Sequence, residues 1–95
     1  MVITEFEKIE KEQIASLKFP SSDVLSDNSL IRERSTDLQK AMVLGNLEHS
    51  KIRIYFEDES SRKMVETTVW AVTDKRVILK QSVGIPISRI HTVAI

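Results

Sequence analysis

Residues with catalytic or metal-binding side chains are few and widely spaced in this chain of 95 residues. The two histidines, His49 and His91, do not have the spacing of a zinc pair, and the chain has no cysteine to complete a site. We expect them to be surface or helix-end histidines. Ser88, His91 and Asp74 supply the residue types of a hydrolytic triad, but no nucleophile-elbow motif accompanies them. The sequence therefore predicts a protein that is not an enzyme and holds no metal and no cofactor.

Basic and aromatic side chains in the second half offer a different chemistry, contact with phosphates or bases. Four basic residues near predicted turns would meet phosphates at one end of the domain, although exposed Lys and Arg also serve solubility. Arg53 and Tyr55 share the solvent face of a predicted strand and form a candidate base-stacking pair. The candidates for binding a partner protein or RNA are Arg53, Tyr55, Lys75, Arg76, Lys80 and Arg89.

Two further features of the sequence have competing interpretations. Trp70, the only tryptophan, lies among strand-forming residues, so core packing is favoured over stacking on a ligand. The acidic run 57–59 is either a site for a cation or basic partner, or a solvated hairpin tip. Its spacing does not fit a calcium loop, and we favour the hairpin tip.

Composition favours one soluble domain. The chain is 41% hydrophobic and 29% charged, which is ordinary for a globular domain, and its formal net charge is zero. Residues 1–50 carry −3 and residues 51–95 carry +3, far from the basic face of a dedicated nucleic-acid binder. No signal-like segment or apolar run long enough for a membrane is present, which predicts a cytoplasmic protein without a membrane partner.

The first half of the chain carries two patterns with helical spacing. Glu5–Leu17 is predicted to be an amphipathic helix, begun by a capping box at Thr4 and Glu7, that docks on the domain or on a second copy of the chain. A linker follows over 18–29, and Leu30–Leu44 is predicted to be a second helix that stops at Gly45. We therefore divide the chain into an N-terminal helix with its linker (1–29) and the remaining domain (30–95).

Arg34 is the one anomaly of the second helix, because it points into the apolar stripe. Either the side chain reaches past its neighbours to water, or the helix restarts at Thr36, which has a capping partner in Gln39. We favour a single helix that bends near residues 35 and 36.

From Ser50 the hydrophobic period changes from 3.6 to 2, which indicates strands. Five short strands joined by turns are expected, the second of them long, bent and apolar on both faces. Closure into a barrel would remove the exposed edges. The predicted fold class is α+β, with N-terminal helices packed on a small five-stranded antiparallel (Sm/SH3-like) barrel. The predicted strands span 50–57, 64–73, 76–80, 83–87 and 89–95.

This order of elements resembles the Sm-like barrels, and among them the Rho-binding antiterminator (Rof-like) family. A helix, a strand ending in an acidic turn, a long bent strand, the strand Arg76–Leu79 and a final Ile-x-x-Ile pattern over 87–90 carry the resemblance, over roughly residues 36–95. The loop 57–63 is longer than the turn usual there, and the N-terminal helix is extra. The resemblance implies a transcription regulator whose partner is the Rho terminator, or an RNA-binding protein.

A second resemblance competes with the first. Residues 71–79, Ala-Val-Thr-Asp-Lys-Arg-Val-Ile-Leu, are similar to a hairpin of bacterial pleckstrin-like domains. Three functions follow in order of preference: an interaction protein that binds a larger protein, an Sm-like RNA-binding protein, and a homo-oligomeric structural module. No arrangement of residues in the sequence supports an enzymatic function.

Overall fold

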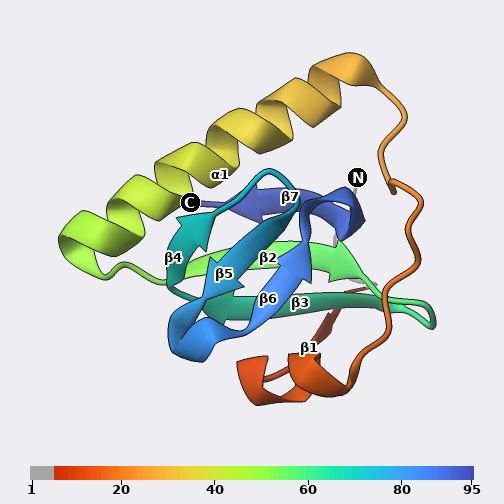
Figure 1. The fold of residues 1–95 in the computed structure, drawn as a ribbon, viewed down its shortest axis with the longest axis horizontal. Coiled ribbons are helices and arrows are strands. Elements are labelled where there is room, and N and C mark those ends of the chain that lie inside the picture. Colours follow the sequence, from red (N-terminus) through yellow and green to blue (C-terminus); the bar gives the residue numbers. More distant parts are fainter. Residues whose placement is uncertain (1–5) are drawn as a thin grey trace.

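Two sheets pack against each other, and one long helix lies across one side of both (Figure 1). This architecture comes from a computed structural model, which describes residues 6–95 apart from the side chain of Ser82. The first sheet has the strand order β1-β3-β2-β7 and the second the order β4-β5-β6. The strands are β1 (Glu7–Lys8), β2 (Ile52–Glu57), β3 (Arg62–Thr67), β4 (Val69–Val72), β5 (Arg76–Leu79), β6 (Gly84–Pro86) and β7 (Ile90–Ala94). The helices are α1 (Asn28–Glu48) and the 3-10 turns η1 (Lys11–Ser16), η2 (Lys80–Ser82) and η3 (Ile87–Arg89).

The core lies between the two sheets and under α1. Alternation along β2 buries every second residue, because successive side chains of a strand point to opposite faces. The same alternation buries Val77 and Leu79 of β5. The core residues are Ile9, Ile14, Leu38, Ala41, Ile52, Ile54, Phe56, Val65, Val69, Val77, Leu79, Ile85, Ile90 and Val93.

The prediction of a closed five-stranded barrel with N-terminal helices packed on it is wrong. The structure has two open sheets, with β1 and β7 at the edges of one and β4 and β6 at the edges of the other. The segment 64–73, predicted to be one long bent strand, is instead divided at Thr68 into β3 and β4, which belong to different sheets. Instead of a further strand pairing, α1 packs on β4 and β7, an edge strand from each sheet (Figure 1). The helix thus covers one edge strand of each sheet, which is another way to protect an edge than closure.

The N-terminal helix predicted for Glu5–Leu17 is also wrong, and its capping residue Thr4 lies outside the described residues. Residues 7 and 8 pair in parallel with β3, and η1 follows at Lys11. The cap is six residues later than expected, at Glu10, whose amide donates to Oε1 of Gln13 over 2.8 Å. An extended segment followed by a 3-10 turn buries Ile9 and Ile14 as well as a helix would.

Residues 18–27, which we call the strap, form no helix or strand, as the linker prediction required. The strap is nevertheless tied to the body of the protein. The amide of Glu59 donates to the carbonyl of Lys18, and the amide of Val24 donates to the carbonyl of Ser88, both over 2.9 Å. Phe19 packs on the core ring of Phe56 with 6.1 Å between centroids.

Helix α1 is a single helix, as favoured, but it begins two residues earlier and ends four residues later than predicted. Asp27 caps its first turn by accepting from the amide of Ser29 at 2.8 Å. Gly45 does not stop it. The lack of a side chain there lets the helix approach the backbone of β4, because a Cβ at this position would collide with the carbonyl oxygen of Val69. The left-handed residue that ends the helix is His49, with φ of 54°.

Both interpretations of Arg34 are wrong. The side chain neither reaches water nor breaks the helix: Arg34 is 5% exposed, on the same face as Leu38, Ala41 and Gly45. Its charge is neutralised by Asp23 of the strap, whose side chain is 33% exposed. The apolar stripe therefore contains a charge whose partner comes from another segment.

Candidate functional site

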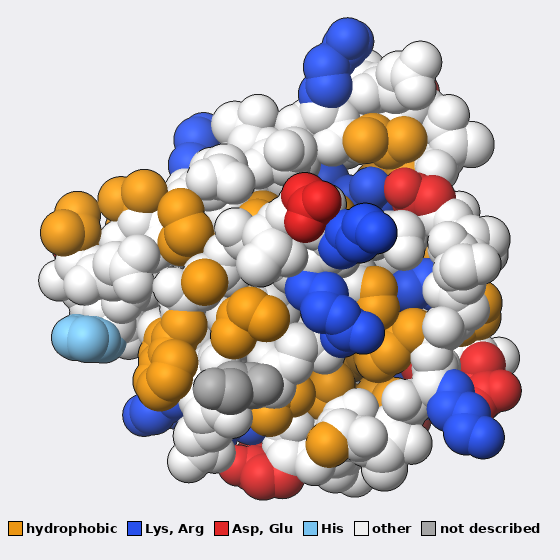
Figure 2. Space-filling model, in the orientation of Figure 1, with side chains coloured by type: hydrophobic (Ala, Val, Ile, Leu, Met, Phe, Trp, Pro, Cys, Tyr) orange, Lys and Arg blue, Asp and Glu red, His pale blue; other side chains and the backbone are white. Residues whose placement is uncertain are grey.

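A groove crosses the face of the protein where α1, the β4–β5 turn, η3 and the strap come together. We call it the hairpin groove; it consists of an upper hollow of about 520 Å³ and a lower one of about 560 Å³. Arg34, Asp74 and Ile87 line both hollows, so the two are adjacent. Figure 2 shows basic side chains around a depression near the middle of this face, with hydrophobic atoms between them.

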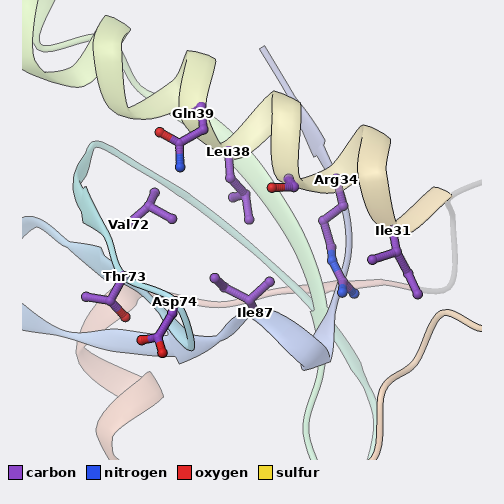
Figure 3. A pocket seen from close by; sticks show the side chains of 9 residues that line it. Ile31, Arg34, Leu38, Gln39, Val72, Thr73, Asp74 and Ile87 are labelled. Atoms are coloured by element: carbon purple, nitrogen blue, oxygen red, sulfur yellow. The ribbon is translucent and has the colours of Figure 1, made fainter. Parts of the chain in front are cut away.

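The upper hollow has an apolar floor and a polar rim (Figure 3). Ile31, Arg34 and Leu38 project into it from α1, because residues three, four and seven apart share one face of a helix. Val72 and Ile87 form the opposite wall. The polar residues of the rim are Ser35, Gln39, Thr73 and Asp74.

The lower hollow carries two cations without acidic partners. Lys75 and Arg76 are exposed, and neither side chain lies within ion-pairing distance of a carboxylate in residues 6–95. The other lining residues come from the strap, the β6–η3 segment, α1 and the β4–β5 turn. They are Phe19, Pro20, Ser21, Asp23, Arg34, Asp74, Pro86, Ile87 and Ser88.

Hydrogen bonds within the β4–β5 turn hold Lys75 and Arg76 in place. The amide of Thr73 donates to the carbonyl of Arg76 over 2.8 Å, and the hydroxyl oxygen of Thr73 accepts from the amides of both basic residues. The carbonyl of Lys75 accepts from the amide of Ile87. The side chain of Thr73 thus stabilises the turn, and the backbone that carries Lys75 and Arg76 is ordered.

Arg34 and Asp23 separate the groove from the core. Arg34 donates to both carboxylate oxygens of Asp23 at 2.9 Å and to the carbonyl of Ile90 at 3.0 Å. The hydrogen bond from Arg34 lowers the pKa of Asp23 below its usual value, against an opposing effect of burial. The Nε of Arg34 is buried and has no partner among the described residues, which leaves one donor unsatisfied at the wall of the upper hollow.

A second groove, which we call the tryptophan groove, lies where the end of α1 meets β4 and η2. It measures about 670 Å³ and contains Trp70 and Lys80. Trp70 is 45% exposed, so the prediction that it packs in the core is wrong. The reason is a β-bulge: Val69 pairs with Leu79 and Ala71 with Ile78, which leaves Trp70 as the extra residue of its strand.

The six predicted site residues are thus divided among four places. Lys75 and Arg76 lie together in the hairpin groove, and Lys80 lies in the tryptophan groove. Arg53 is on the outer face of the first sheet, where its Nε lies 3.7 Å from a carboxylate oxygen of Glu66. On the same sheet, Tyr55 packs edge-on against Phe6, with 5.2 Å between centroids.

Arg89, the sixth of these residues, is 6% exposed and faces inward. Its Nε donates to the carbonyl of Glu57 at 3.0 Å, and one terminal nitrogen donates to the carbonyl of Ser22 at 2.8 Å. It therefore ties the strap to the hairpin that joins β2 and β3. Unlike the other five predicted site residues, Arg89 is buried and does not face solvent.

The acidic run 57–59 is only partly a solvated tip. Asp58 is 4% exposed and accepts from the buried ammonium of Lys63 at 3.1 Å and from the amide of Ser61 at 2.8 Å. A carboxylate oxygen of Glu57 lies 2.9 Å from Nε2 of His91 and accepts from it when that nitrogen carries a hydrogen. Only Glu59 is fully exposed, so the carboxylates of this run stabilise the loop rather than face a ligand together.

Sequence reasoning missed Arg34 and Asp23 as groove residues, and it missed Lys51 and His49 beside Trp70. The arginine in the apolar stripe was a signal for the first pair, because a charge at a core position needs a partner. No comparable signal marked the tryptophan groove, whose residues come together only through the bulge and the end of α1.

Within residues 6–95, no three histidine or acidic side chains are grouped closely enough to hold a metal ion, and no helix has the length and hydropathy to cross a membrane. Comparison with protein-family models, curated proteins and solved structures finds no match to the chain.

Proposed function

We propose that the protein is a non-enzymatic interaction module that binds an extended, acidic segment of a larger protein in the hairpin groove. The observation that supports this most is the pairing of Lys75 and Arg76, which have no acidic partner within residues 6–95, with an apolar floor that extends into a second hollow. Apolar side chains of the bound segment would pack on Ile31 and Ile87. Its carboxylates would meet the two cations.

The shape of the groove favours a chain over a compact small molecule. Two hollows of similar volume lie next to each other and share Arg34, Asp74 and Ile87, which suits alternate side chains of an extended peptide. Of the carboxylates that line the hollows, Asp23 is already paired with Arg34, so the two cations outnumber the one remaining acid, Asp74.

The resemblance to the Rof-like family gives this proposal a named partner, the Rho terminator, and with it a role in transcription regulation. The named partner rests on that resemblance alone. The groove supports the class of partner, an acidic protein segment. The alternative that the protein forms homo-oligomers is tested alongside, by light scattering on the free protein.

The test compares wild-type protein with the double variant Lys75→Ala/Arg76→Ala. The probes are purified Rho and a short synthetic peptide that alternates aspartate with leucine. We expect the double variant to weaken binding about tenfold or more, since two charge-assisted contacts are lost. The binding should also weaken as salt is raised, because charges at a groove rim are screened.

A matched control replaces two exposed basic residues of α1 that lie outside the groove, in the variant Arg32→Ala/Lys40→Ala. This control should bind both probes as the wild type does. If the two double variants bind equally well, the groove is not the docking site. If wild-type protein binds neither probe more tightly than about 1 mM, the proposal fails. Failure with Rho alone removes that partner.

A further inference from the structure

The tryptophan groove is a second surface, separate from the hairpin groove, and no residue lines both. It lies between the C-terminal end of α1, the bulged strand β4 and η2. In Figure 2, hydrophobic side chains gather around the end of α1 and continue over the neighbouring β4. The lining residues are Gly45, Asn46, His49, Lys51, Thr68, Trp70 and Lys80.

The groove is held rigidly around Trp70. The amide of Lys80 donates to the carbonyl of Thr68 over 3.1 Å, and the hydroxyl of Thr68 donates to the carbonyl of His49 over 3.3 Å. Gly45 brings α1 against the backbone of β4 directly beneath. The exposed indole is therefore carried on a bulged strand whose backbone is ordered on both sides of the groove.

The charges around this platform are of one sign. Lys51 and Lys80 line the groove, no carboxylate does, and neither lysine lies within ion-pairing distance of an acidic side chain in the described part of the chain. The imidazole of His49 and the amide of Asn46 add polar groups that can contact the edge of a planar ligand. The arrangement is one aromatic face flanked by cations.

From this arrangement we infer that the tryptophan groove binds single-stranded RNA, with one base stacked on Trp70 and the adjacent phosphates on Lys51 and Lys80. Aromatic side chains in a basic groove are how proteins bind single strands without reading their sequence. A base inside a duplex cannot reach the indole, whereas bases of single-stranded RNA are free to splay out. The protein would then join an RNA to the partner bound in the hairpin groove.

An acidic peptide is the other anion that these lysines would attract, and the lining argues against it. A peptide anchors by burying an apolar side chain in a pocket. Among the described residues that line this groove, Trp70 is the only large apolar side chain, and its neighbours are polar residues and a glycine. A base needs only one aromatic face together with polar groups at its edge.

The test measures the fluorescence anisotropy of a labelled oligoadenylate as protein is added at low and moderate salt. We expect binding by the wild type, and binding about fivefold or more weaker in Trp70→Ala, because stacking on one aromatic residue is lost. Trp70→Phe keeps an aromatic face and should retain most of the affinity. In Lys51→Ala/Lys80→Ala the slope of log affinity against log salt should fall by about 0.7 for each phosphate contact removed.

The variant Lys75→Ala/Arg76→Ala is the matched control, since it removes two cations from the other groove. It should bind the oligonucleotide as the wild type does, so that failure here and failure of the protein-binding proposal are distinguishable. Thermal unfolding confirms that each variant is folded. Because Trp70 is the only tryptophan, quenching of its emission by unlabelled oligoadenylate reports contact at this site directly.

Four results would overturn the inference. The first is no binding by the wild type at low salt, and the second is equal binding by Trp70→Ala. The third is binding confined to the deoxy-oligonucleotide of the same sequence. The fourth is quenching of Trp70 by an oligoglutamate peptide as strong as that by the RNA.

Discussion

Asp23 and Arg34 lock the strap to α1: both carboxylate oxygens of Asp23 accept from the guanidinium of Arg34 at 2.9 Å. The pair bridges a segment without regular structure and the middle of the buried face of the helix. Arg34 is almost completely buried, so its charge depends on this one partner and on the carbonyl of Ile90. The stability of the strap and the stability of α1 are therefore coupled.

Replacing Asp23 with Asn should destabilise the protein by about 1–3 kcal/mol, because Arg34 keeps its buried charge and loses charged acceptors. The free energy of unfolding in urea measures this loss. Glu33→Gln, at an exposed position on the same helix, should change stability by less than about 0.5 kcal/mol.

The double variant Asp23→Asn/Arg34→Met should recover part of the loss, because an apolar side chain no longer requires a charged partner at that position. The double-mutant cycle of Asp23→Asn, Arg34→Met and the combination then gives a coupling energy of about 1 kcal/mol or more. Strictly additive effects would contradict a stabilising interaction between Asp23 and Arg34.

Asp58 should make stability depend on acid pH. Burial raises the pKa of its carboxyl, but hydrogen bonds from the amides of Ser61 and Ser60 and from Lys63 outweigh this and leave the pKa lowered. A lowered folded-state pKa means that the stabilisation is complete above the unfolded-state pKa of about 3.9 and is lost as pH falls through the folded-state value.

The variant Asp58→Asn should be less stable than the wild type by about 3 kcal/mol near neutral pH, because Lys63 loses its buried counter-ion. The difference should stay constant down to about pH 5 and shrink below about pH 4. Urea unfolding over that range tests it, with the exposed neighbour variant Glu59→Gln as control. A difference independent of pH would show that the charge of Asp58 contributes nothing.

Gly45→Ala should destabilise the protein although alanine favours helices by about 1 kcal/mol over glycine. The new Cβ collides with the carbonyl of Val69, and backbone cannot move aside as a flexible side chain can. We expect a net loss of about 1–3 kcal/mol in thermal or urea unfolding. Lys40→Ala, exposed on the same helix, should be nearly neutral, and a stabilised Gly45→Ala would refute the close approach of α1 to β4.

Arg89 should behave differently from Lys75 in every assay. Arg89→Ala leaves the carbonyls of Glu57 and Ser22 without their donor and should cost about 3 kcal/mol of stability. Lys75→Ala should change stability by less than about 0.5 kcal/mol and affect binding alone. The combination of unfolding curves and peptide titrations separates the two roles; a stable Arg89→Ala would contradict the structural one.

Local patterns predicted the strands well, because the alternation of buried and exposed side chains in a half-buried strand can be recognised from consecutive residues. The segments 52–57, 76–79 and 90–94 are strands as expected, whereas the long second strand predicted over 64–73 is divided between two sheets. Lys75 and Arg76 also came together as their adjacency at a turn suggested. These features need no knowledge of distant contacts.

The errors share a different cause, which is pairing between segments far apart in the chain. The N-terminal segment fits a helical arc, but its parallel pairing with β3 competes successfully with helix formation. Trp70 belongs to the solvent face only because β4 and β5 pair with a bulge. Arg34 is buried only because Asp23 arrives from the strap. Closure of a barrel, likewise, depends on which edges α1 covers.

The strap closes some of the longest loops of the fold. Its contacts join residues 22 and 89, separated by 67 positions, while Arg34 reaches the carbonyl of Ile90 across 56 positions. Contacts of such high sequence separation have the largest cost in loop-closure entropy, and they therefore slow folding. During synthesis, α1 therefore emerges with an arginine that lacks one of its acceptors until η3 and β7 have followed. Residues 22 and 34 therefore complete their hydrogen bonds only when residues 89 and 90 are in place.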